Sequence, residues 1–131
     1  MNITLNEIRG LNAGVNAIMT RELPPPTANL FSRLIVNFIK ELQDIEKERN
    51  RLAVKYAKKD ADGKPLFKKD KKNNSAYDLT KDNRIAMGVE WDKLTQREIE
   101  IPFEPIKPTK EVFGETITAD ILYQLGKLIE E

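Results

Sequence analysis

The chain contains no cysteine and no histidine among its 131 residues. The absence of cysteine excludes a disulfide framework, a thiolate zinc site and a thiol nucleophile, and it favours a reducing compartment. The absence of histidine removes the usual zinc sites, the serine and cysteine triads and the commonest general base near neutral pH. Catalysis would have to use carboxylates, lysines, tyrosines or a hard metal ion. We therefore expect no enzyme, with no catalytic residues and no cofactor-binding or metal-binding site.

The chain also lacks a long apolar run and an excess of charge of either sign. No window approaches the roughly 18 apolar residues that a membrane span needs, and Glu7 and Arg9 interrupt the N-terminal segment where a secretory signal would be apolar. Lys and Arg total 22 against 21 Asp and Glu, so the whole chain has no strong attraction for nucleic acid or an anionic membrane. We expect a cytosolic protein without a membrane partner.

The apolar pattern predicts one domain over residues 1–131, of the α+β class and mainly α. Thr4 and Glu7 have the spacing of a capping box, which predicts a first helix through about Thr20. Gly10 and Gly14 each weaken this helix by up to about 1 kcal/mol relative to alanine. The first helix therefore depends on packing against the rest of the domain.

A long helix is predicted over about residues 28–59, where apolar residues recur at alternating steps of four and three. Three prolines at 24–26 predict an extended connector before it, with Thr27 or Asn29 as the N-cap. The second half of this helix has only a narrow apolar seam between charged flanks. Such a seam suits either a helix of the same chain or a second copy of the chain, and we favour an antiparallel helical hairpin within the chain.

Residues 60–79 predict a lysine-rich β-hairpin that protrudes from the helices. Asp62-Gly63 is a turn dipeptide, and residues 65–67 and 76–79 have the composition of two short strands. The polar segment between those strands, KKDKKNNS, is typical of a solvated loop tip.

The C-terminal third predicts a helix, a short edge strand and a final helix. Thr80 or Asp82 can cap the first of these helices, whose partial apolar face includes Ile85 and Val89. Isoleucine and phenylalanine alternate with glutamate over residues 98–104, which predicts a strand that Pro102 confines to a sheet edge.

A final helix over about residues 118–130 has Thr118 as its N-cap.

Three kinds of chemical site can be tested against the sequence, and none of them fits. In a calcium loop with Gly63 at position six, Lys58 and Lys69 would occupy ligand positions one and twelve. The two Gly-Lys pairs, at 63–64 and 126–127, have no glycine at the spacing that a P-loop requires. Neighbouring carboxylates lie beside lysines or arginines on faces that we expect to be exposed, so no acid–base pair is predicted.

Positive charge is concentrated in residues 55–72, which hold eight lysines against three acids. Such a hairpin can contact phosphates, although simple solvation explains the same residues. Few aromatic residues are available nearby for stacking on bases, which argues against nucleic acid as the main partner. Trp91, the lone tryptophan, can anchor a partner surface or seal the third helix against the long one, and we favour the second role. The candidate partner contacts are Lys58, Lys59, Lys64, Lys68, Lys69, Lys71, Lys72 and Trp91.

Several segments together resemble a type of small uncharacterised protein of tailed-phage and prophage genomes. They are a leucine-proline entry to a long helix, E-x-x-R followed by K-Y, the turn D-x-D-G-K, a glutamate-rich helix, the strand EIEIPFEPI and the terminal segment ITADILYQLGKLIEE. The resemblance covers most of the chain from Leu23 onward, and only the run of three prolines departs from it. It implies a viral origin and a non-enzymatic role, and it carries over no functional residues.

These observations lead to the interpretation of a phage-type interaction protein that acts through protein–protein contacts, as a virion component or assembly factor, in the host-cell cytosol or the virion. The alternative is an inhibitor of a host nuclease or anti-phage defence enzyme, with weak nucleic-acid contact through the lysine-rich hairpin. The expected partners are a virion or host protein and, through the long helix, a second copy of the chain.

Overall fold

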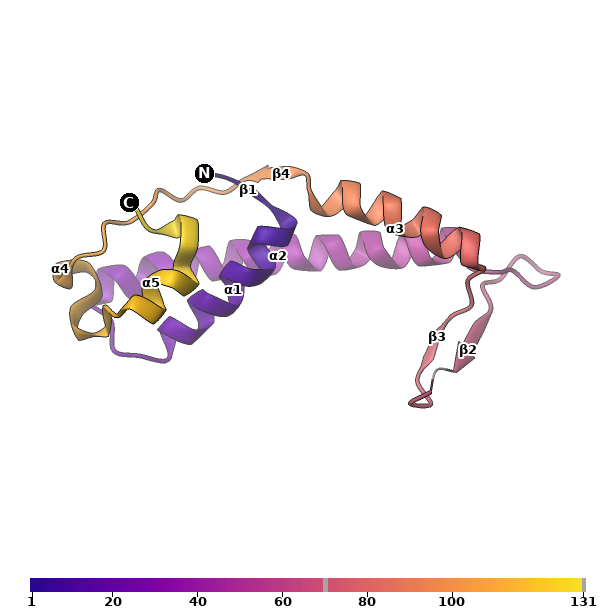
Figure 1. Ribbon diagram of the computed structural model, residues 1–131, viewed down its shortest axis with the longest axis horizontal. Coiled ribbons are helices and arrows are strands. Elements are labelled where there is room, and N and C mark those ends of the chain that lie inside the picture. The colour runs from indigo at the N-terminus through magenta and orange to yellow at the C-terminus, as the bar shows by residue number, and fades with distance from the viewer. Residues whose placement is uncertain (70, 131) are drawn as a thin grey trace. The chain divides into compact units, whose positions relative to one another are not determined.

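The computed structural model describes residues 1–69 and 71–130, apart from the side chain of Thr116. Asp70 of the predicted hairpin and Glu131 lie outside the described residues. Within them the fold is α+β and mainly α, as the sequence predicted, and it has two antiparallel two-stranded sheets, of which the β1–β4 sheet was not predicted (Figure 1). Contacts divide the chain into unit 1, residues 1–43 and 96–131, and unit 2, residues 44–95. The prediction of a single domain stays a prediction.

Unit 1 begins with a short strand and a capped helix. In β1 (Asn2–Thr4), Ile3 pairs with Ile99 of β4 (Glu98–Glu100) in an antiparallel register. The capping box that begins α1 (Leu5–Met19) is confirmed, because the Thr4 hydroxyl accepts from the Glu7 amide at 3.2 Å and the Glu7 carboxylate accepts from the Thr4 amide at 3.1 Å. The pairing continues with two bonds, from the Ile101 amide to the Met1 carbonyl at 2.8 Å and from the Met1 ammonium to the Ile101 carbonyl at 3.0 Å, after which Pro102 offers no N–H.

The long helix α2 (Pro25–Tyr56) begins within the run of prolines. The prediction of an extended connector through Pro26 was wrong, because the first amides of a helix have no intrahelical partner and proline loses nothing by lacking one there. The Ala28 amide donates to the Pro24 carbonyl at 3.0 Å. Thr27, proposed above as a cap, is buried, and its hydroxyl donates to the Val112 carbonyl.

The core of unit 1 lies between α1, the first half of α2 and the C-terminal segments. Phe31 of α2 is fully buried, and its ring lies 6.2 Å from that of Phe103 and 6.1 Å from that of Phe113, which ends α4 (Lys110–Phe113). A turn of 3-10 helix, η1 (Gly114–Thr116), follows α4. Each of the three rings comes from a different segment, so this cluster joins them.

The final helix α5 (Ala119–Leu125) is shorter than the predicted residues 118–130. Its cap at Thr118 is as predicted, with the Thr118 hydroxyl accepting from the Ile121 amide at 3.3 Å. Gly126, at φ +46°, ends the α-helix, and a 3-10 turn, η2 (Gly126–Leu128), follows. A left-handed residue at this position stops the helical ladder that the apolar pattern alone would continue.

Unit 2 contains the second half of α2, two short strands and α3 (Lys81–Thr95). Within this unit α3 runs antiparallel to α2, because Arg49 lies by Trp91 while the Asn83 amide group donates to the Tyr56 carbonyl at 3.0 Å. The second half of the long helix therefore pairs with a helix of its own chain. Thr80 caps α3 as predicted, its hydroxyl accepting from the Asn83 amide at 3.1 Å.

Candidate interaction surfaces

A β-hairpin rich in lysine lies between α2 and α3 in the sequence and extends from the end of that helix pair (Figure 1). We call residues 58–69 and 71–78 the basic hairpin. Its strands β2 (Phe67–Lys69) and β3 (Ser75–Tyr77) are antiparallel, with Phe67 opposite Tyr77 and Lys69 opposite Ser75. The hairpin holds all seven predicted lysine contacts, namely Lys58, Lys59, Lys64, Lys68, Lys69, Lys71 and Lys72.

Backbone hydrogen bonds fix the base of the basic hairpin. The Lys58 amide donates to the Asp78 carbonyl, the Leu66 amide to the Lys58 carbonyl, and the Asp78 amide to the Leu66 carbonyl, at 2.7, 2.7 and 2.8 Å. Three separate stretches of chain therefore hold one another at this point, although they bury little apolar surface.

The Asp62-Gly63 dipeptide forms a tight turn, with Gly63 at φ +78°. One carboxylate oxygen of Asp60 accepts from the amides of Asp62 and Lys64, both at 2.9 Å. Asp60 thus stabilises the turn with the atoms that a calcium loop would direct at the ion. Among the described residues, no group of three or more acidic side chains gathers in a way that could hold a metal ion.

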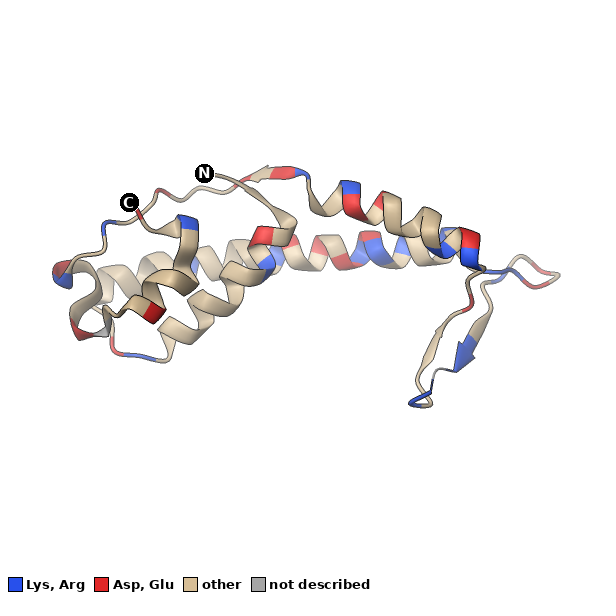
Figure 2. Cartoon of the chain, viewed as in Figure 1, with Lys and Arg blue, Asp and Glu red and all other residues tan. Residues whose placement is uncertain are grey.

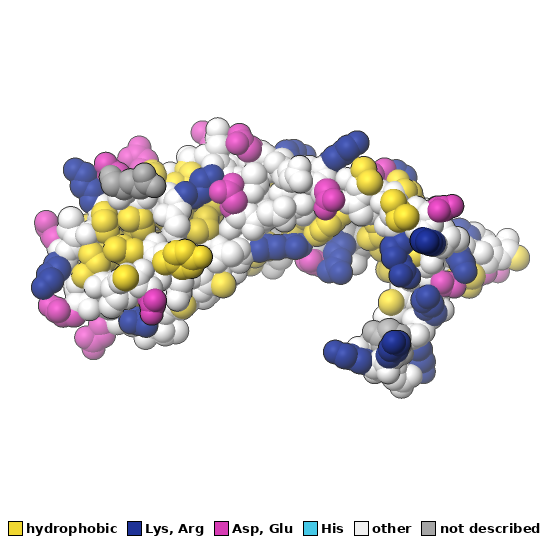
Figure 3. Space-filling model, viewed as in Figure 1, with side chains coloured by type: hydrophobic (Ala, Val, Ile, Leu, Met, Phe, Trp, Pro, Cys, Tyr) yellow, Lys and Arg dark blue, Asp and Glu magenta, His cyan; other side chains and the backbone are white. Residues whose placement is uncertain are grey.

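The hairpin lysines are exposed, and most of them make no ion pair with a carboxylate of the described residues. Lys58 lies 3.6 Å from the Asp78 carboxylate, and the Lys59 ammonium donates to the Val54 carbonyl. Within residues 1–69 and 71–130, no carboxylate lies within ion-pair distance of the ammonium groups of Lys64, Lys68, Lys69 and Lys71. Figure 2 marks the lysine positions along the hairpin, and Figure 3 shows positive side chains over it on the viewed face.

The basic hairpin also carries an exposed pair of aromatic rings. Phe67 and Tyr77 are directly opposite each other, with ring centroids 4.6 Å apart and an interplanar angle of 31°. Phe67 remains 59% exposed and Tyr77 is half-buried. Because side chains two residues apart share a face of a strand, Lys69 and Ser75 lie on the same face as the rings.

Trp91 lies in the contact between α2 and α3, away from the lysines. Its ring centroid is 6.0 Å from the Arg49 guanidinium, and its side chain is half-buried. At the preceding residue, the Glu90 carboxylate accepts from the Lys55 ammonium at 3.0 Å and from the Tyr56 hydroxyl at 2.8 Å. The bond from Lys55, then that from Tyr56, lowers the pKa of Glu90, and the same carboxylate raises the pKa of Tyr56. The surroundings of Trp91 are thus those of a helix–helix contact.

The outward side of α3 carries Ile85 and Val89, two residues of the partial apolar face that the sequence predicted. We call Lys81, Arg84, Ile85, Gly88, Val89 and Asp92 the α3 outer face, since all six are exposed. Ile85 is 59% exposed and Val89 is 50% exposed. The apolar residues of α3 lie around most of the helix, so their pattern does not select the face that is buried. In the sequence, this face is marked by Gly88, which lies between the aliphatic residues Ile85 and Val89.

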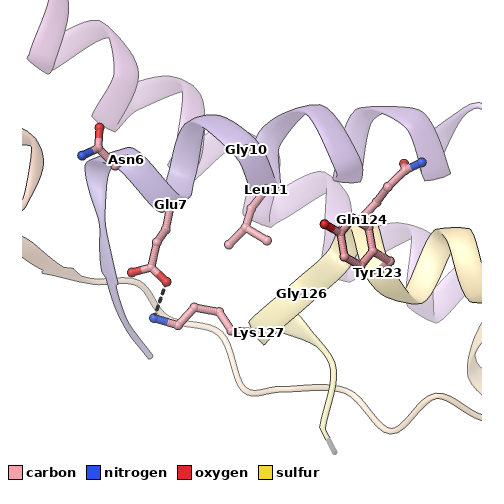
Figure 4. A pocket seen from close by; sticks show the side chains of 8 residues that line it. All are labelled: Asn6, Glu7, Gly10, Leu11, Tyr123, Gln124, Gly126 and Lys127. Atoms are coloured by element: carbon pink, nitrogen blue, oxygen red, sulfur yellow. Dashed lines mark ion pairs between the residues drawn. The ribbon is translucent and has the colours of Figure 1, made fainter.

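A shallow pocket in unit 1 lies where α1 meets the end of α5 (Figure 4). It has a volume of about 280 Å³, and Leu11 and Tyr123 form part of its wall. The Lys127 ammonium lies 2.8 Å from the Glu7 carboxylate at its rim, and this contact holds the pKa of Glu7 below its ordinary value. Because the Glu7 and Lys127 charges are paired with each other, the pocket has little polar capacity left to bind a ligand.

The Glu7–Lys127 pair gives a testable pH dependence. Because the folded-state pKa of Glu7 is depressed, its contribution to stability is present near neutral pH and is lost as the pH falls below about 4.3, the value for an unfolded chain. We expect Glu7→Gln to lower the free energy of unfolding at pH 7 by at most about 1 kcal/mol, since both side chains are partly exposed.

That difference between wild type and Glu7→Gln should shrink at pH 3 in urea titrations followed by circular dichroism. Glu104→Gln, at an exposed position without an ion pair in the described part of the chain, is the matched control and should change little at either pH. An equal loss at both pH values would contradict the ion pair.

Within the described helices, none has both the length and the apolar character needed to cross a membrane. No family model, no curated protein and no solved structure matches the chain.

Proposed function

We propose that this chain is a non-enzymatic interaction protein of the phage type, acting through protein–protein contacts as a virion component or assembly factor. The α3 outer face is the observation that carries the proposal. The resemblance to phage and prophage proteins supplies the viral setting, and this face supplies the contact.

The chain's own packing gives no reason for the composition of the α3 outer face. A glycine inside a helix costs up to about 1 kcal/mol relative to alanine, yet a Cβ at Gly88 would meet nothing within 4 Å. Ile85 and Val89, on either side of Gly88, leave more apolar surface in water than single scattered residues do. A partner that packs closely over the glycine accounts for all three residues.

The same face is complementary to itself. Residues 81, 85, 88 and 92 follow steps of four, three and four, which place them along one side of the helix. In two antiparallel copies centred between Ala86 and Met87, each Ile85 lies opposite Gly88 of the other copy. The same register sets Lys81 opposite Asp92 at both ends. The partner that fits this face is therefore a second copy of the chain, related by a two-fold axis.

Sedimentation equilibrium over a range of concentrations tests this proposal. We expect a monomer–dimer equilibrium that Lys81→Asp weakens roughly tenfold, because two acidic residues then face each other at both ends of the pair. Adding Asp92→Lys to Lys81→Asp reverses both pairs and should restore the dimer.

Gly88→Leu provides a second variant that separates folding from association. Leucine favours the helix, so the monomer should become more stable while the dimer weakens, because the space for Ile85 is lost. A chain that stays monomeric up to about 1 mM, or a double charge reversal as weak as the single one, would overturn self-association. Either result would favour the inhibitor alternative, in which one host protein is bound.

A further inference from the structure

We infer that the basic hairpin is a binding site for single-stranded nucleic acid, in which a base stacks on Phe67 while neighbouring lysines contact the phosphates. This site lies outside the α3 outer face and is independent of self-association. The sequence alone argues against nucleic acid, because aromatic residues near the lysines are few. The structure places two of those residues, Phe67 and Tyr77, side by side on the hairpin.

The aromatic pair provides a surface for stacking. Tyr77 contacts Phe67 at 4.6 Å between ring centroids, so the cross-strand partner supports the Phe67 ring. Phe67 nevertheless keeps 59% of its surface exposed. Every base has a flat π-face, so an exposed and supported ring can stack on a base of any sequence.

The charge around the rings suits a phosphate backbone. Lys69 shares the face of the ring pair, Lys68 points to the opposite face of the same strand, and Lys64 and Lys71 lie in the flanking turns. Two of the nearby acids are engaged locally, since Asp60 accepts from turn amides and Asp78 lies near Lys58. Positive charge thus remains close to the exposed ring.

The composition of the hairpin distinguishes a nucleic acid from an acidic protein. Residues 55–79 contain eight lysines and no arginine. Protein interfaces are depleted in lysine, whereas lysine binds phosphate as a point charge, so the abundance of lysine favours phosphate over an acidic protein surface. Seven of the lysines and the exposed ring therefore favour a polyanion that also carries flat apolar groups.

A single strand fits these features better than a duplex. In a duplex the bases are stacked on one another, and a ring on a hairpin surface reaches them only after unpairing. In a single strand both the bases and the phosphates are accessible. The net charge of the whole chain is +1, so we expect weak binding that depends strongly on salt.

Fluorescence anisotropy with labelled oligothymidylate of about 15 nucleotides tests the inference. We expect a dissociation constant in the micromolar range at low salt, and a plot of log K against log salt with a slope of about −2 to −3 for three or four phosphate contacts. Phe67→Ala should weaken binding at least about fivefold and leave this slope unchanged, while Phe67→Tyr should retain binding.

Charge variants test the second half of the site. Replacing Lys68, Lys69 and Lys71 together with serine should make the slope shallower by about 2, since each lost phosphate contact removes about 0.7. The matched control replaces Lys40, Lys93 and Lys107, exposed lysines outside the hairpin, and should leave the slope nearly unchanged. Circular dichroism of each variant verifies that the fold is intact.

Three results would overturn the inference: no binding at low salt, equal binding to duplex with no effect of Phe67→Ala, and competition by polyglutamate as effective as competition by oligothymidylate. The Gly88→Leu variant, which weakens self-association without changing the charge, should bind the oligonucleotide as wild type does. A failure of one proposal therefore does not imply a failure of the other.

Discussion

Replacing Phe31 with alanine is expected to lower the free energy of unfolding by about 3–5 kcal/mol. The Phe31 side chain is fully buried, and its ring contacts Phe103 and Phe113, which belong to segments far away in the sequence. Removing the ring leaves a cavity at the point where α2, the chain after β4 and α4 meet. Urea titration followed by circular dichroism measures the loss.

Phe67→Ala is the matched control for Phe31→Ala. The chemical change is the same, but Phe67 is 59% exposed and its ring contact is with Tyr77 of the adjacent strand. We expect a loss of about 1 kcal/mol or less, since only a surface cross-strand pair is removed. Equal losses for the two variants would contradict both the core around Phe31 and the exposure of the hairpin ring.

Helix starts could be predicted from the sequence where a side chain satisfies the first amides. Thr4 with Glu7, Thr80 and Thr118 all cap helices as expected, because each hydroxyl lies three residues before the amide that it accepts from. The prediction of an extended connector at the three prolines was wrong because the effect of proline depends on its position within the helix. In the middle of a helix proline breaks the ladder, and in the first turn it does not.

The outward side of α3 could not be predicted, because the face that a helix buries is decided by its partner. Ile85, Val89 and Leu94 are all apolar, and α3 has apolar residues on both sides. Only the contacts with α2, such as those of Asn83 and Glu90, show which side faces inward. Once that is known, Ile85 and Val89 must lie outward.

The charge and the turn of the basic hairpin could be predicted from the sequence, but the pairing of its aromatic residues could not. Its lysines follow from counting charge along the chain, and Asp62-Gly63 identifies a turn. The pairing of Phe67 with Tyr77 depends on the register of two three-residue strands across the loop between them. Such short strands carry too few alternating residues to fix a register from sequence.

Gly14→Ala is expected to lower the free energy of unfolding by about 1–3 kcal/mol, although alanine is the better helix former. A Cβ at residue 14 would lie 2.5 Å from the carbonyl oxygen of Gln124 and 3.0 Å from its carbonyl carbon. These are backbone atoms of α5, so no side chain can rotate away, and the two helices must move apart. The overpacking therefore outweighs the gain in helix propensity.

Gly10→Ala in the same helix is the internal control, because a Cβ at residue 10 would meet nothing within 4 Å. At residue 10 only the higher helix propensity of alanine acts, and we expect the free energy of unfolding to rise by up to about 1 kcal/mol. The two substitutions are chemically identical and one turn apart, so opposite signs in parallel urea titrations isolate the close approach of α1 to α5. If Gly14→Ala stabilised the chain as Gly10→Ala does, α5 could not lie against α1 at Gly14.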